Sequence, residues 1–513
     1  MLQSPKIFIS HTTRDERDNS LAHKLAAGLQ ENGSDVWISP DTIPTGAEWR
    51  SEIISALLLD CTHFLVIISA AATMSEWVLA EIKLAKKRRE SDASFTILPL
   101  IVSKTVDYDG KDFVDKFQQI PYQDNFSDLL IIVTKSLNLR PGIPNRYLKL
   151  TERFVGRNYV FAAIDDFISS NDHGYFTIVG DPGEGKSALI SEYVKRTGCI
   201  AHFNLRAEGI NRAEHFVKSI SLQLSARFGL SFGSIPSNPA EFGLHLNDRL
   251  KQASIQLDQG DRLVIAIDAL DEVDFFDGPP GVNLLYLPQY LPKGVYFILS
   301  SRRKNLPFVV RAPQKIFDLI HYREQSLEDI KSYIREAFAR LNLENWISRQ
   351  KGETTELINK LAEKSEYNFM YLFYVMPEIE KGAYQTLDVN KLPLGLFSYY
   401  EDHFDRMGMR TKPLPKDKLR IIYVIAEVRC PVSRTLISKL AIQDPVVVQQ
   451  VIEEWKEFLH EQIVNKERRY SIYHTSFLDF LHDKEIIKAT GETFTGLHEA
   501  IANTLWQELM ENN

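Results

Sequence analysis

The chain has few cysteines, no long apolar run and no excess of basic residues. Its 513 residues include only Cys61, Cys199 and Cys430, and no two of these are spaced as in a zinc or dithiol motif. So sparse a set is typical of a reducing compartment. The net charge of -8 argues against nucleic acid as the main partner, because phosphate backbones are bound by basic surfaces.

Membrane and repeat signals are missing as well. Residues 1–6 hold no apolar core of a secretory signal. The longest apolar run, Phe64–Met74, falls far short of the ~20 residues that a membrane-spanning helix needs. We find no internal repeat and no low-complexity segment. We therefore expect a cytoplasmic protein without a membrane partner.

What the chain does contain is enough sequence for several domains. Apolar residues make up 44% and charged residues 25%, which is ordinary for globular protein, and the length indicates roughly three or four domains. We expect an α/β domain at residues 1–140, a linker at 141–153, a second α/β domain at 154–310, a helical domain at 311–400 and a C-terminal domain at 401–513.

The first region alternates short apolar runs with helical patterns. Leu21, Leu25 and Leu29 form one stripe of a helix that Asn32-Gly33 would end. Strand–helix alternation at this spacing predicts a parallel sheet covered on both faces. The expected strands are Lys6–Ser10, Val36–Ile38, Phe64–Ile68 and Ile97–Ile101, and two further helices are expected at Glu48–Leu59 and Ser75–Lys87.

The second region carries a phosphate-binding motif. The expected strand Tyr175–Val179 runs into a G-x-x-x-x-G-K-S loop and then a helix, and its eight residues are Gly180, Asp181, Pro182, Gly183, Glu184, Gly185, Lys186 and Ser187. Glycines let successive N–H groups face a phosphate, and the helix adds its positive end. Lys186 would neutralise the β- and γ-phosphates of ATP or ADP, and Ser187 would hold Mg²⁺.

Acidic and basic residues follow the next two expected strands. Leu263–Ile267 delivers Asp268, which we expect to hold the Mg²⁺ water shell, and then Asp271 and Glu272, either of which would orient the attacking water. Tyr296–Leu299 runs into Ser300-Ser301-Arg302-Arg303. Arg302 is placed to sense the γ-phosphate, and the plain alternative is a solvated arginine pair.

Beyond residue 310 the apolar pattern is mostly helical. Leu357–Met376 and Leu419–Leu440 are expected helical stretches, and Tyr470–Ile472 a short strand before a last helical stretch.

These motifs together resemble one class of ATPases. Val155-Gly156-Arg157, the P-loop, the Asp268–Glu272 motif and Ser300–Arg303 resemble signal-transducing NTPases of the NACHT and apoptotic type. Residues Tyr470–Asp483 resemble the winged-helix domain of that class. The resemblance implies that His474 touches the β-phosphate of ADP and that Arg157 lies near the adenine. A satisfied core histidine is the alternative for His474.

The N-terminal region resembles a TIR domain. The resemblance rests on Phe8–His11 with Asp15, on Trp37–Trp49 and on Ser75–Glu81, and it departs at Val78, where many relatives have cysteine. In NAD⁺-cleaving TIR enzymes the glutamate of W-x-x-x-E is catalytic, which implies Glu81 here, four residues after Trp77. Trp77 and five further residues would line the NAD⁺ cleft: Ser10, His11, Asp41, Trp49 and Arg50. The alternative is that Glu81 is an exposed helix glutamate.

Two functions follow from these resemblances. The first is an oligomerising, ADP/ATP-switched defence protein whose TIR domain cleaves NAD⁺ to nicotinamide and ADP-ribose or a cyclic variant, with slow ATP hydrolysis. The second is a non-enzymatic TIR scaffold whose ATPase controls recruitment of another TIR protein. A motor ATPase or P-loop kinase would leave the TIR region unexplained. Because relatives of this class usually carry a C-terminal repeat sensor, three alternatives stay open: a separate sensor protein, sensing by the helical region 310–400, or a truncated chain.

Overall fold

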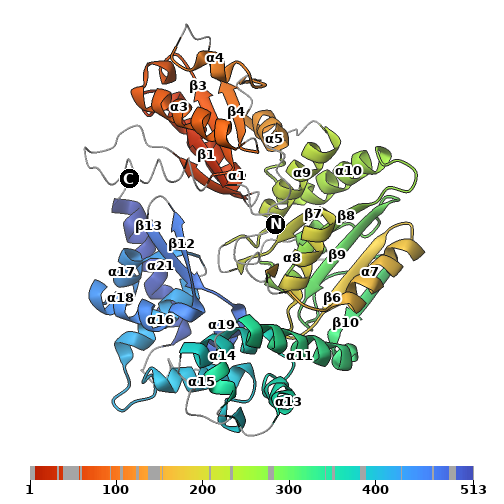
Figure 1. Cartoon of the computed structure of the whole chain (residues 1–513), viewed down its shortest axis with the longest axis vertical. Helices are drawn as coiled ribbons and strands as arrows, with labels where there is room; N and C mark the ends of the chain where they lie inside the picture. The colour runs from red at the N-terminus through yellow and green to blue at the C-terminus, as the bar shows by residue number, and fades with distance from the viewer. Residues whose placement is uncertain are drawn as a thin grey trace.

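The computed structural model shows a multidomain α/β chain with three sheets (Figure 1). Their strand orders are β2-β1-β3-β4-β5, β10-β6-β9-β8-β7 and β11-β13-β12. The residues that the structure describes are 6–31, 34–38, 57, 61–92, 94–103, 108–122, 126–136, 151–152, 154–206, 209–230, 235–274, 282–340, 343–348, 350, 353–381, 389–428, 430–464, 467–484 and 493–511.

The N-terminal sheet is parallel throughout and buried on both faces, as expected. Ile7 and Ile9 face one apolar cluster and Phe8 the other, because side chains alternate along a strand. The strands are β1 (Lys6–Ser10), β2 (Asp35–Ile38), β3 (His63–Ile68), β4 (Thr96–Ile101) and β5 (Ile120–Pro121), and the helices α1 (Glu16–Glu31), α3 (Glu76–Ser91), α4 (Lys111–Val114) and α5 (Phe126–Ser136). Of the expected helix Glu48–Leu59, only Leu57 lies within the described residues.

The second sheet is also parallel and lies beside the first in Figure 1. Its strands are β6 (Gly174–Val179), β7 (Ile200–Phe203), β8 (Leu263–Asp268), β9 (Val295–Ser301) and β10 (Gln314–Asp318), and its helices α7 (Asn158–Ser170), α8 (Lys186–Thr197), α9 (Ala213–Phe228) and α10 (Phe242–Ile255). The expected boundary at residue 310 is wrong in one respect. Strand β10 follows it and pairs with β6, so the sheet is complete only at Asp318.

Helices follow the second sheet: α11 (Arg323–Arg340), α12 (Glu344–Ile347), α13 (Thr354–Lys364), α14 (Phe369–Lys381) and α15 (Gly395–Arg406). The expected stretch Leu357–Met376 is two helices, because Glu366 and Tyr367 adopt positive φ angles of 51° and 64° and break the α-helical hydrogen bonding. Helix α15 crosses the expected boundary at residues 400 and 401. One apolar cluster, from Ile330 to Ile501, unites these helices with the C-terminal part.

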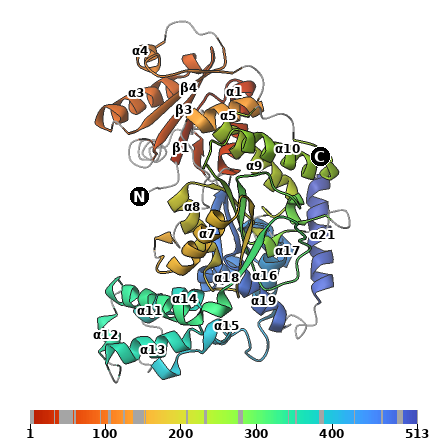
Figure 2. The same ribbon diagram turned by 90° about the vertical axis from the view of Figure 1, so that its right-hand side faces the viewer.

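The C-terminal part combines helices with a small antiparallel sheet. Its elements are α16 (Lys416–Val428), β11 (Val432–Ser433), α17 (Arg434–Ala441), α18 (Pro445–Glu454), β12 (Leu459–Val464), β13 (Glu467–Ile472), α19 (Thr475–Lys484) and α21 (Phe494–Glu511). The expected helical stretch Leu419–Leu440 is therefore interrupted by β11, where Ser433 caps α17 through its hydroxyl. Figure 2 shows α21 running alongside this part of the molecule.

Short 3-10 helices complete the described elements. They are Ala72–Met74, Pro239–Glu241, Leu270–Glu272, Leu284–Tyr286, Leu319–Tyr322, Val389–Lys391 and Lys456–Phe458.

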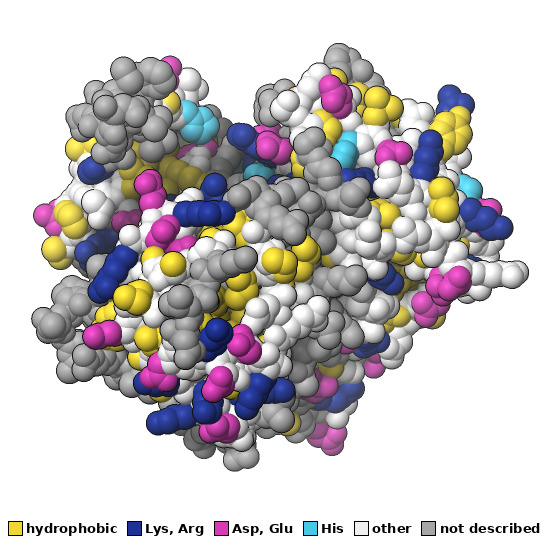
Figure 3. All heavy atoms as spheres, turned by 90° about the horizontal axis from the view of Figure 1, so that it is seen from above, with side chains coloured by type: hydrophobic (Ala, Val, Ile, Leu, Met, Phe, Trp, Pro, Cys, Tyr) yellow, Lys and Arg dark blue, Asp and Glu magenta, His cyan; other side chains and the backbone are white. Residues whose placement is uncertain are grey.

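No helix of the described residues combines the length and the apolar character that crossing a bilayer requires. On the face seen in Figure 3, Lys and Arg side chains are interspersed with Asp and Glu, and among the residues described there neither sign forms an extended patch.

The N-terminal sheet is attached to the second one through a shared apolar contact. Helix α5 packs against α9, and Leu222 of α9 belongs to the same cluster as Leu129, Leu130 and Val133 of α5. Leu224, two residues later, faces the core of the second sheet instead. The two leucines lie on opposite sides of α9, because two helical residues are about 200° apart.

We predict that Leu222→Ala loosens this attachment. Truncating a buried leucine costs about 2–5 kcal/mol, and here the loss falls between two packed elements. Backbone amides of residues 126–136 should exchange hydrogen faster, while those of the second sheet keep their protection. Leu224→Ala is the matched control, since it should reverse the pattern. Equal exchange of residues 126–136 in wild type and Leu222→Ala would contradict the contact.

Candidate functional site

The P-loop residues form a tight turn between β6 and α8. Gly183 and Gly185 both adopt a φ of 84°, which side chains other than glycine disfavour. The Lys186 ammonium donates to the backbone carbonyls of Gly180 at 2.8 Å and Asp181 at 2.9 Å. Desolvation lowers the pKa of Lys186, although nearby carboxylates, chiefly Asp271, oppose this. The turn therefore places the Lys186 ammonium beside the N-terminus of α8.

Asp268 lies at the carboxyl end of β8 and is 1% exposed. Burial raises the pKa of Asp268, and hydrogen bonds from Ser300 and Ser187 partly offset the effect. Its Oδ2 atom accepts no hydrogen bond within the described residues. An unsatisfied buried carboxylate oxygen beside a serine fits Mg²⁺, which binds through one or two protein groups and keeps several waters.

No larger metal-binding group accompanies this pair. Among the residues described, no cluster of three or more His, Cys, Asp or Glu side chains is arranged to hold a metal ion. Ser187 and Asp268 would therefore hold Mg²⁺ only together with water and phosphate oxygens.

One cavity joins the P-loop to the helical and C-terminal parts of the chain. Of the expected nucleotide-binding residues it is lined by Arg157, Pro182, Gly183, Gly185, Lys186, Ser187, Asp271, Glu272, Arg302 and His474. Gly180, Asp181, Glu184 and Asp268 do not line it. Residues some 300 positions apart thus share one space, with the P-loop and the C-terminal part each forming some of its wall.

His474 reaches this cavity just after β13 and before α19. Its Nδ1 atom accepts from the Ser476 backbone N–H at 3.2 Å and lies 2.6 Å from the Ser476 hydroxyl. An accepting Nδ1 leaves the proton of a neutral ring on Nε2. The tautomer inferred from these contacts therefore offers an N–H donor, the group that a phosphate oxygen accepts from.

Arg302 connects the second sheet to α19. Its Nε atom lies 3.1 Å from Asp271 Oδ2, and its backbone N–H donates to Asp271 Oδ1 at 3.0 Å. On the other side the guanidinium contacts Asp479 at 2.5 Å and the hydroxyl of Thr475. The side chain is 13% exposed, so the alternative of a solvated arginine pair does not describe it.

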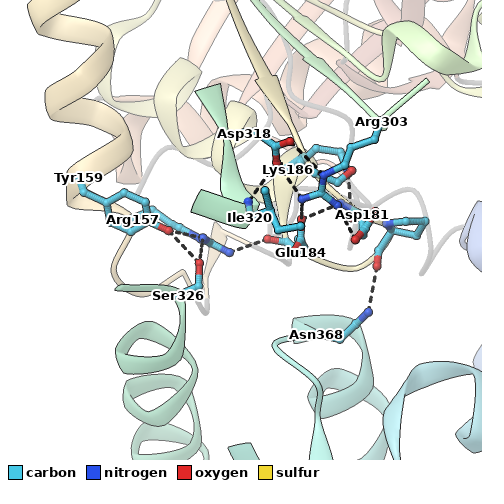
Figure 4. A network of polar contacts seen from close by, with 12 residues as sticks. Arg157, Tyr159, Asp181, Glu184, Lys186, Arg303, Asp318, Ile320, Ser326 and Asn368 are labelled. Atoms are coloured by element: carbon cyan, nitrogen blue, oxygen red, sulfur yellow. Dashed lines mark hydrogen bonds and ion pairs between the residues drawn. The ribbon is translucent and has the colours of Figure 1, made fainter. Parts of the chain in front are cut away.

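Arg303 secures the P-loop from outside the cavity (Figure 4). It binds both carboxylate oxygens of Asp318, at 3.0 and 3.1 Å from its Nε atom, and pairs with Asp181 and, at 3.5 Å, with Glu184. In this structure Asp181 and Glu184 therefore stabilise the conformation of the P-loop by pairing with Arg303. The missed element β10 supplies Asp318, which is why the sequence showed no partner for Arg303.

Arg157 contacts the same turn from the other side. Its guanidinium donates to the Glu184 carbonyl at 2.6 Å and to Ser326 at 3.0 Å (Figure 4). It also lies over the ring of Phe369, 5.1 Å from its centroid. Arg157 therefore lies between the P-loop and an aromatic wall of the cavity.

The start of α14 closes over the P-loop, and the sequence showed no signal for this. The Asn368 side chain donates to the Pro182 carbonyl and the Phe369 N–H to the Gly183 carbonyl, both at 2.9 Å. A Cβ atom at Gly183 would overlap the Asn368 side chain, so this close approach also requires glycine. The positive φ angles of Glu366 and Tyr367 direct the chain into this contact.

A second polar site lies at the carboxyl edge of the N-terminal sheet. The Ser10 hydroxyl, at the end of β1, donates to Glu81 Oε2 of α3 at 2.6 Å. Glu81 is 1% exposed, so it is not the exposed helix glutamate of the alternative. His11 follows Ser10 and lies 3.2 Å from the Asn19 side-chain oxygen through Nε2. Trp77 is partly exposed one turn before Glu81.

The remaining expected NAD⁺ residues, Asp41, Trp49 and Arg50, lie outside the described residues. From that set the structure brings Ser10 and Glu81 into contact, while His11 contacts Asn19.

Asp18 is a buried acid at the same sheet edge that the sequence did not single out. The Ser69 hydroxyl, just past β3, donates to Asp18 Oδ2, and the Ala72 N–H donates to Ser69 at 3.0 Å. Desolvation raises the pKa of Asp18 to about 6. Its position within the polar face of α1 looks like an ordinary helix aspartate until the neighbouring strand is known.

Comparison with known proteins identifies the N-terminal region. Residues 7–130 match the family model described as TIR domain, so the expected TIR domain is confirmed. No curated protein matches the chain. Solved structures of NtrX from Brucella abortus with ADP and with ATP cover 88% of this chain and 100% of their own, at 11% and 10% identity. Their TM-score of 0.24 is too low to support any inference.

The raised pKa of Asp18 predicts a pH-dependent stability. The folded protein binds more protons than the unfolded chain between about pH 4 and 6, so this group makes the free energy of unfolding fall as the pH rises through that window. Asp18→Asn removes the ionised form. Its melting temperature relative to wild type should therefore increase from pH 4 to 6 and stay constant above. Glu16→Gln, an exposed position of the same helix, is the control, and a pH-independent difference for Asp18→Asn would refute the assignment.

The contact between Arg302 and α19 predicts a change in local opening. Asp479→Asn keeps the side-chain shape but removes the charge, and a charged pair with one partly exposed member contributes on the order of 1 kcal/mol. Hydrogen exchange of residues 475–484 should become about two- to tenfold faster. Asp483→Asn alters an exposed acid of the same helix and should match wild type. If Asp479→Asn also matched wild type, Arg302 would not hold α19.

Proposed function

We propose that this protein is a nucleotide-switched TIR enzyme, in which ADP or ATP bound at the P-loop controls NAD⁺ cleavage by the N-terminal domain. One observation carries the proposal: a single cavity is lined both by Lys186 and Ser187 and by His474. A nucleotide in that cavity would contact both the P-loop and the C-terminal part around His474. Whether the nucleotide is ADP or ATP can therefore determine whether these two parts stay in contact.

The P-loop would hold the phosphates. The Lys186 ammonium would exchange the carbonyls of Gly180 and Asp181 for phosphate oxygens, and the N-terminus of α8 adds backbone N–H groups. Ser187 and the free oxygen of Asp268 would complete a Mg²⁺ site, and the cation would neutralise the phosphate charge. Arg157 and the ring of Phe369 would lie toward the base.

The C-terminal part would act as a lid whose position depends on whether the nucleotide carries a γ-phosphate. Its order of helix, strand, two helices and two strands, α16 to β13, is that of a winged helix, which supports the resemblance to NACHT-type NTPases. In the ADP state the Nε2–H of His474 would donate to the β-phosphate. Arg302 is engaged by Asp479 in this closed arrangement, and it would turn to a γ-phosphate only after α19 moves away.

Glu81 would be the catalytic group of the TIR domain. Water adds to the ribose carbon as the bond to nicotinamide breaks, which gives nicotinamide, ADP-ribose and a proton; a cyclic product forms if an atom of the same molecule replaces the water. Positive charge develops on the ribose, and a fixed carboxylate stabilises it. The Ser10 hydroxyl holds the Glu81 carboxylate in place at 2.6 Å.

Assembly would connect the two sites. Opening of the lid would allow chains to associate through their TIR and NTPase domains, and tethering raises the effective concentration of TIR domains into the mM range. Residues 39–50 of one chain, which lie outside the described residues, would then complete the NAD⁺ cleft of the next. A separate sensor protein would supply the trigger, in a cytoplasmic defence response.

One observation favours the rival function, a scaffold without enzyme activity. Glu81 is 1% exposed and hydrogen-bonded to Ser10, an arrangement that would also suit a purely structural carboxylate. The two functions differ in one product, because only the enzyme releases nicotinamide.

The test uses the loosened lid in place of the unknown trigger. Purified Asp479→Asn with ATP and Mg²⁺ should release nicotinamide from NAD⁺, and adding Glu81→Gln should reduce the rate at least 100-fold without changing assembly by light scattering. Adding Glu76→Gln, an exposed acid of the same helix, should leave the rate unchanged. Adding Lys186→Ala should abolish nucleotide binding and release. NAD⁺ cleavage that survives Glu81→Gln, or assembly without any nicotinamide, would overturn the enzymatic function.

A further inference from the structure

Two buried hydroxyl groups connect His474 to helix α15. The Tyr400 hydroxyl of α15 lies 2.8 Å from the Ser476 hydroxyl, and the Ser476 hydroxyl lies 2.6 Å from the Nδ1 atom of His474. Tyr400 and Ser476 are both 0% exposed, whereas His474 lines the cavity beside the P-loop. A row of polar atoms therefore leads from a buried side chain of α15 to the cavity wall.

The direction of each hydrogen bond in this row follows from the protons that are available. The Ser476 backbone N–H donates to His474 Nδ1 at 3.2 Å, so this nitrogen carries no proton. The Ser476 hydroxyl then donates its single proton to the same nitrogen. Because that proton is used, the Ser476 oxygen accepts from Tyr400, and the Tyr400 phenol is the first donor of the row.

Tyr400 is fixed by packing and keeps its proton. With ring centroids 5.3 to 5.5 Å apart, it packs against Phe458, Phe477 and Phe480. Burial raises the pKa of the Tyr400 phenol, so the phenol stays a donor at neutral pH. Hydrogen bonds in a row polarise and strengthen one another, so this donor strengthens the bond from Ser476 to His474.

The row determines what His474 presents to the cavity. With Nδ1 accepting, the proton of the neutral ring lies on Nε2. Tyr400 and Ser476 do not line the cavity, so their influence on a ligand has to pass through His474. A ring whose orientation and tautomer are already set loses less freedom when a ligand binds.

We propose that Tyr400 is a positioning residue, which acts through Ser476 to hold His474 as an Nε2–H donor to the phosphate of the bound nucleotide. The inference rests on the proposed nucleotide site and adds to it a residue that does not touch the ligand. Because Tyr400 belongs to α15 and Ser476 to α19, ADP binding depends on the packing of these two helices. A movement of α15 away from α19 would lower the affinity for ADP without changing any residue of the cavity.

The first test is a double-mutant cycle on the full chain, with ADP affinity measured by titration calorimetry. Tyr400→Phe should weaken ADP about two- to tenfold, the range that corresponds to one neutral hydrogen bond. His474→Ala should also weaken ADP, and binding stays measurable at higher nucleotide concentration because the P-loop is intact. In the His474→Ala background Tyr400→Phe should have no further effect, since its only route to the ligand is gone. Equal weakening by Tyr400→Phe in both backgrounds, or no weakening in either, would overturn the proposal.

The matched control is the neighbouring tyrosine of α15. The Tyr399 hydroxyl is buried and donates to Glu457 at 3.2 Å, so Tyr399→Phe also removes a buried hydrogen bond but leaves the row to His474 intact. Both variants should lower the ligand-free melting temperature, and only Tyr400→Phe should lower the affinity for ADP. If Tyr399→Phe weakened ADP as much as Tyr400→Phe does, a general loosening of α15 would explain the effect and the positioning role would be wrong.

The second test observes the ring of His474 directly. The ¹⁵N spectrum of histidine-labelled protein distinguishes protonated from unprotonated ring nitrogens, and loss of signals in His474→Ala assigns them. In the wild-type complex with ADP, in mildly alkaline buffer, Nε2 should carry the proton and Nδ1 none. A proton on Nδ1 would reverse the hydrogen bonds of the row and overturn the proposal.

These tests separate the inference from the proposed nucleotide site. Wild-type protein that binds no ADP, or Lys186→Ala that binds it as well as wild type, would overturn the nucleotide site itself. ADP affinity that His474→Ala leaves unchanged would overturn the role of His474, and with it the role of Tyr400. ADP binding that depends on Lys186 and His474 but not on Tyr400 would overturn only the present inference.

Discussion

One charged contact links the second sheet to the C-terminal part: Arg302, just past β9, joins Asp271, just past β8, to Asp479 of α19. The guanidinium lies in a space that is largely removed from water, and there an arginine needs carboxylate partners to offset its desolvation. Because its two partners belong to different parts of the chain, the charge balance of the cavity and the position of α19 are linked. A third anion in the cavity would compete with both.

The P-loop is held in place independently of any ligand. Arg303 neutralises acids on its outer side, Arg157 binds its backbone and Asn368 covers its tip. A turn supported in this way needs little rearrangement to receive a phosphate, which is the general benefit of preorganisation. Asn368 and the two side chains that bind these arginines, Asp318 and Ser326, come from elements after residue 310, so the later part of the chain contributes to the phosphate site together with the motif.

The local features of this fold could be predicted from sequence, and the long-range ones could not. Lys6–Ser10 and the loop at Gly180–Ser187 follow short patterns whose periodicity and glycines determine their structure. Strand β10 lies at the edge of the sheet and is partly polar and exposed. It therefore has no apolar run from which a strand could be predicted. Residues 366 and 367 break a helix by backbone conformation alone, in a stretch whose composition favours a helix.

The residues of the candidate site likewise divide into those that a local motif predicts and those that only long-range contacts reveal. The P-loop and Asp268 were identified because a short motif specifies their chemistry, and the structure brings them together. The partners of Arg302 and Arg303 were missed, because Asp479 and Asp318 are single acids far away in sequence. Asp18 was missed for another reason: only burial distinguishes it from an ordinary surface residue.

The packing of Leu222 into the N-terminal core has a consequence for work on isolated fragments. A fragment that ends near residue 140 would lack this leucine and expose the α5 surface of Leu129, Leu130 and Val133. Uncovered apolar surface of that kind promotes association of identical copies. Self-association of such a fragment would then result from the missing contact with Leu222 and would not indicate that the intact chain associates.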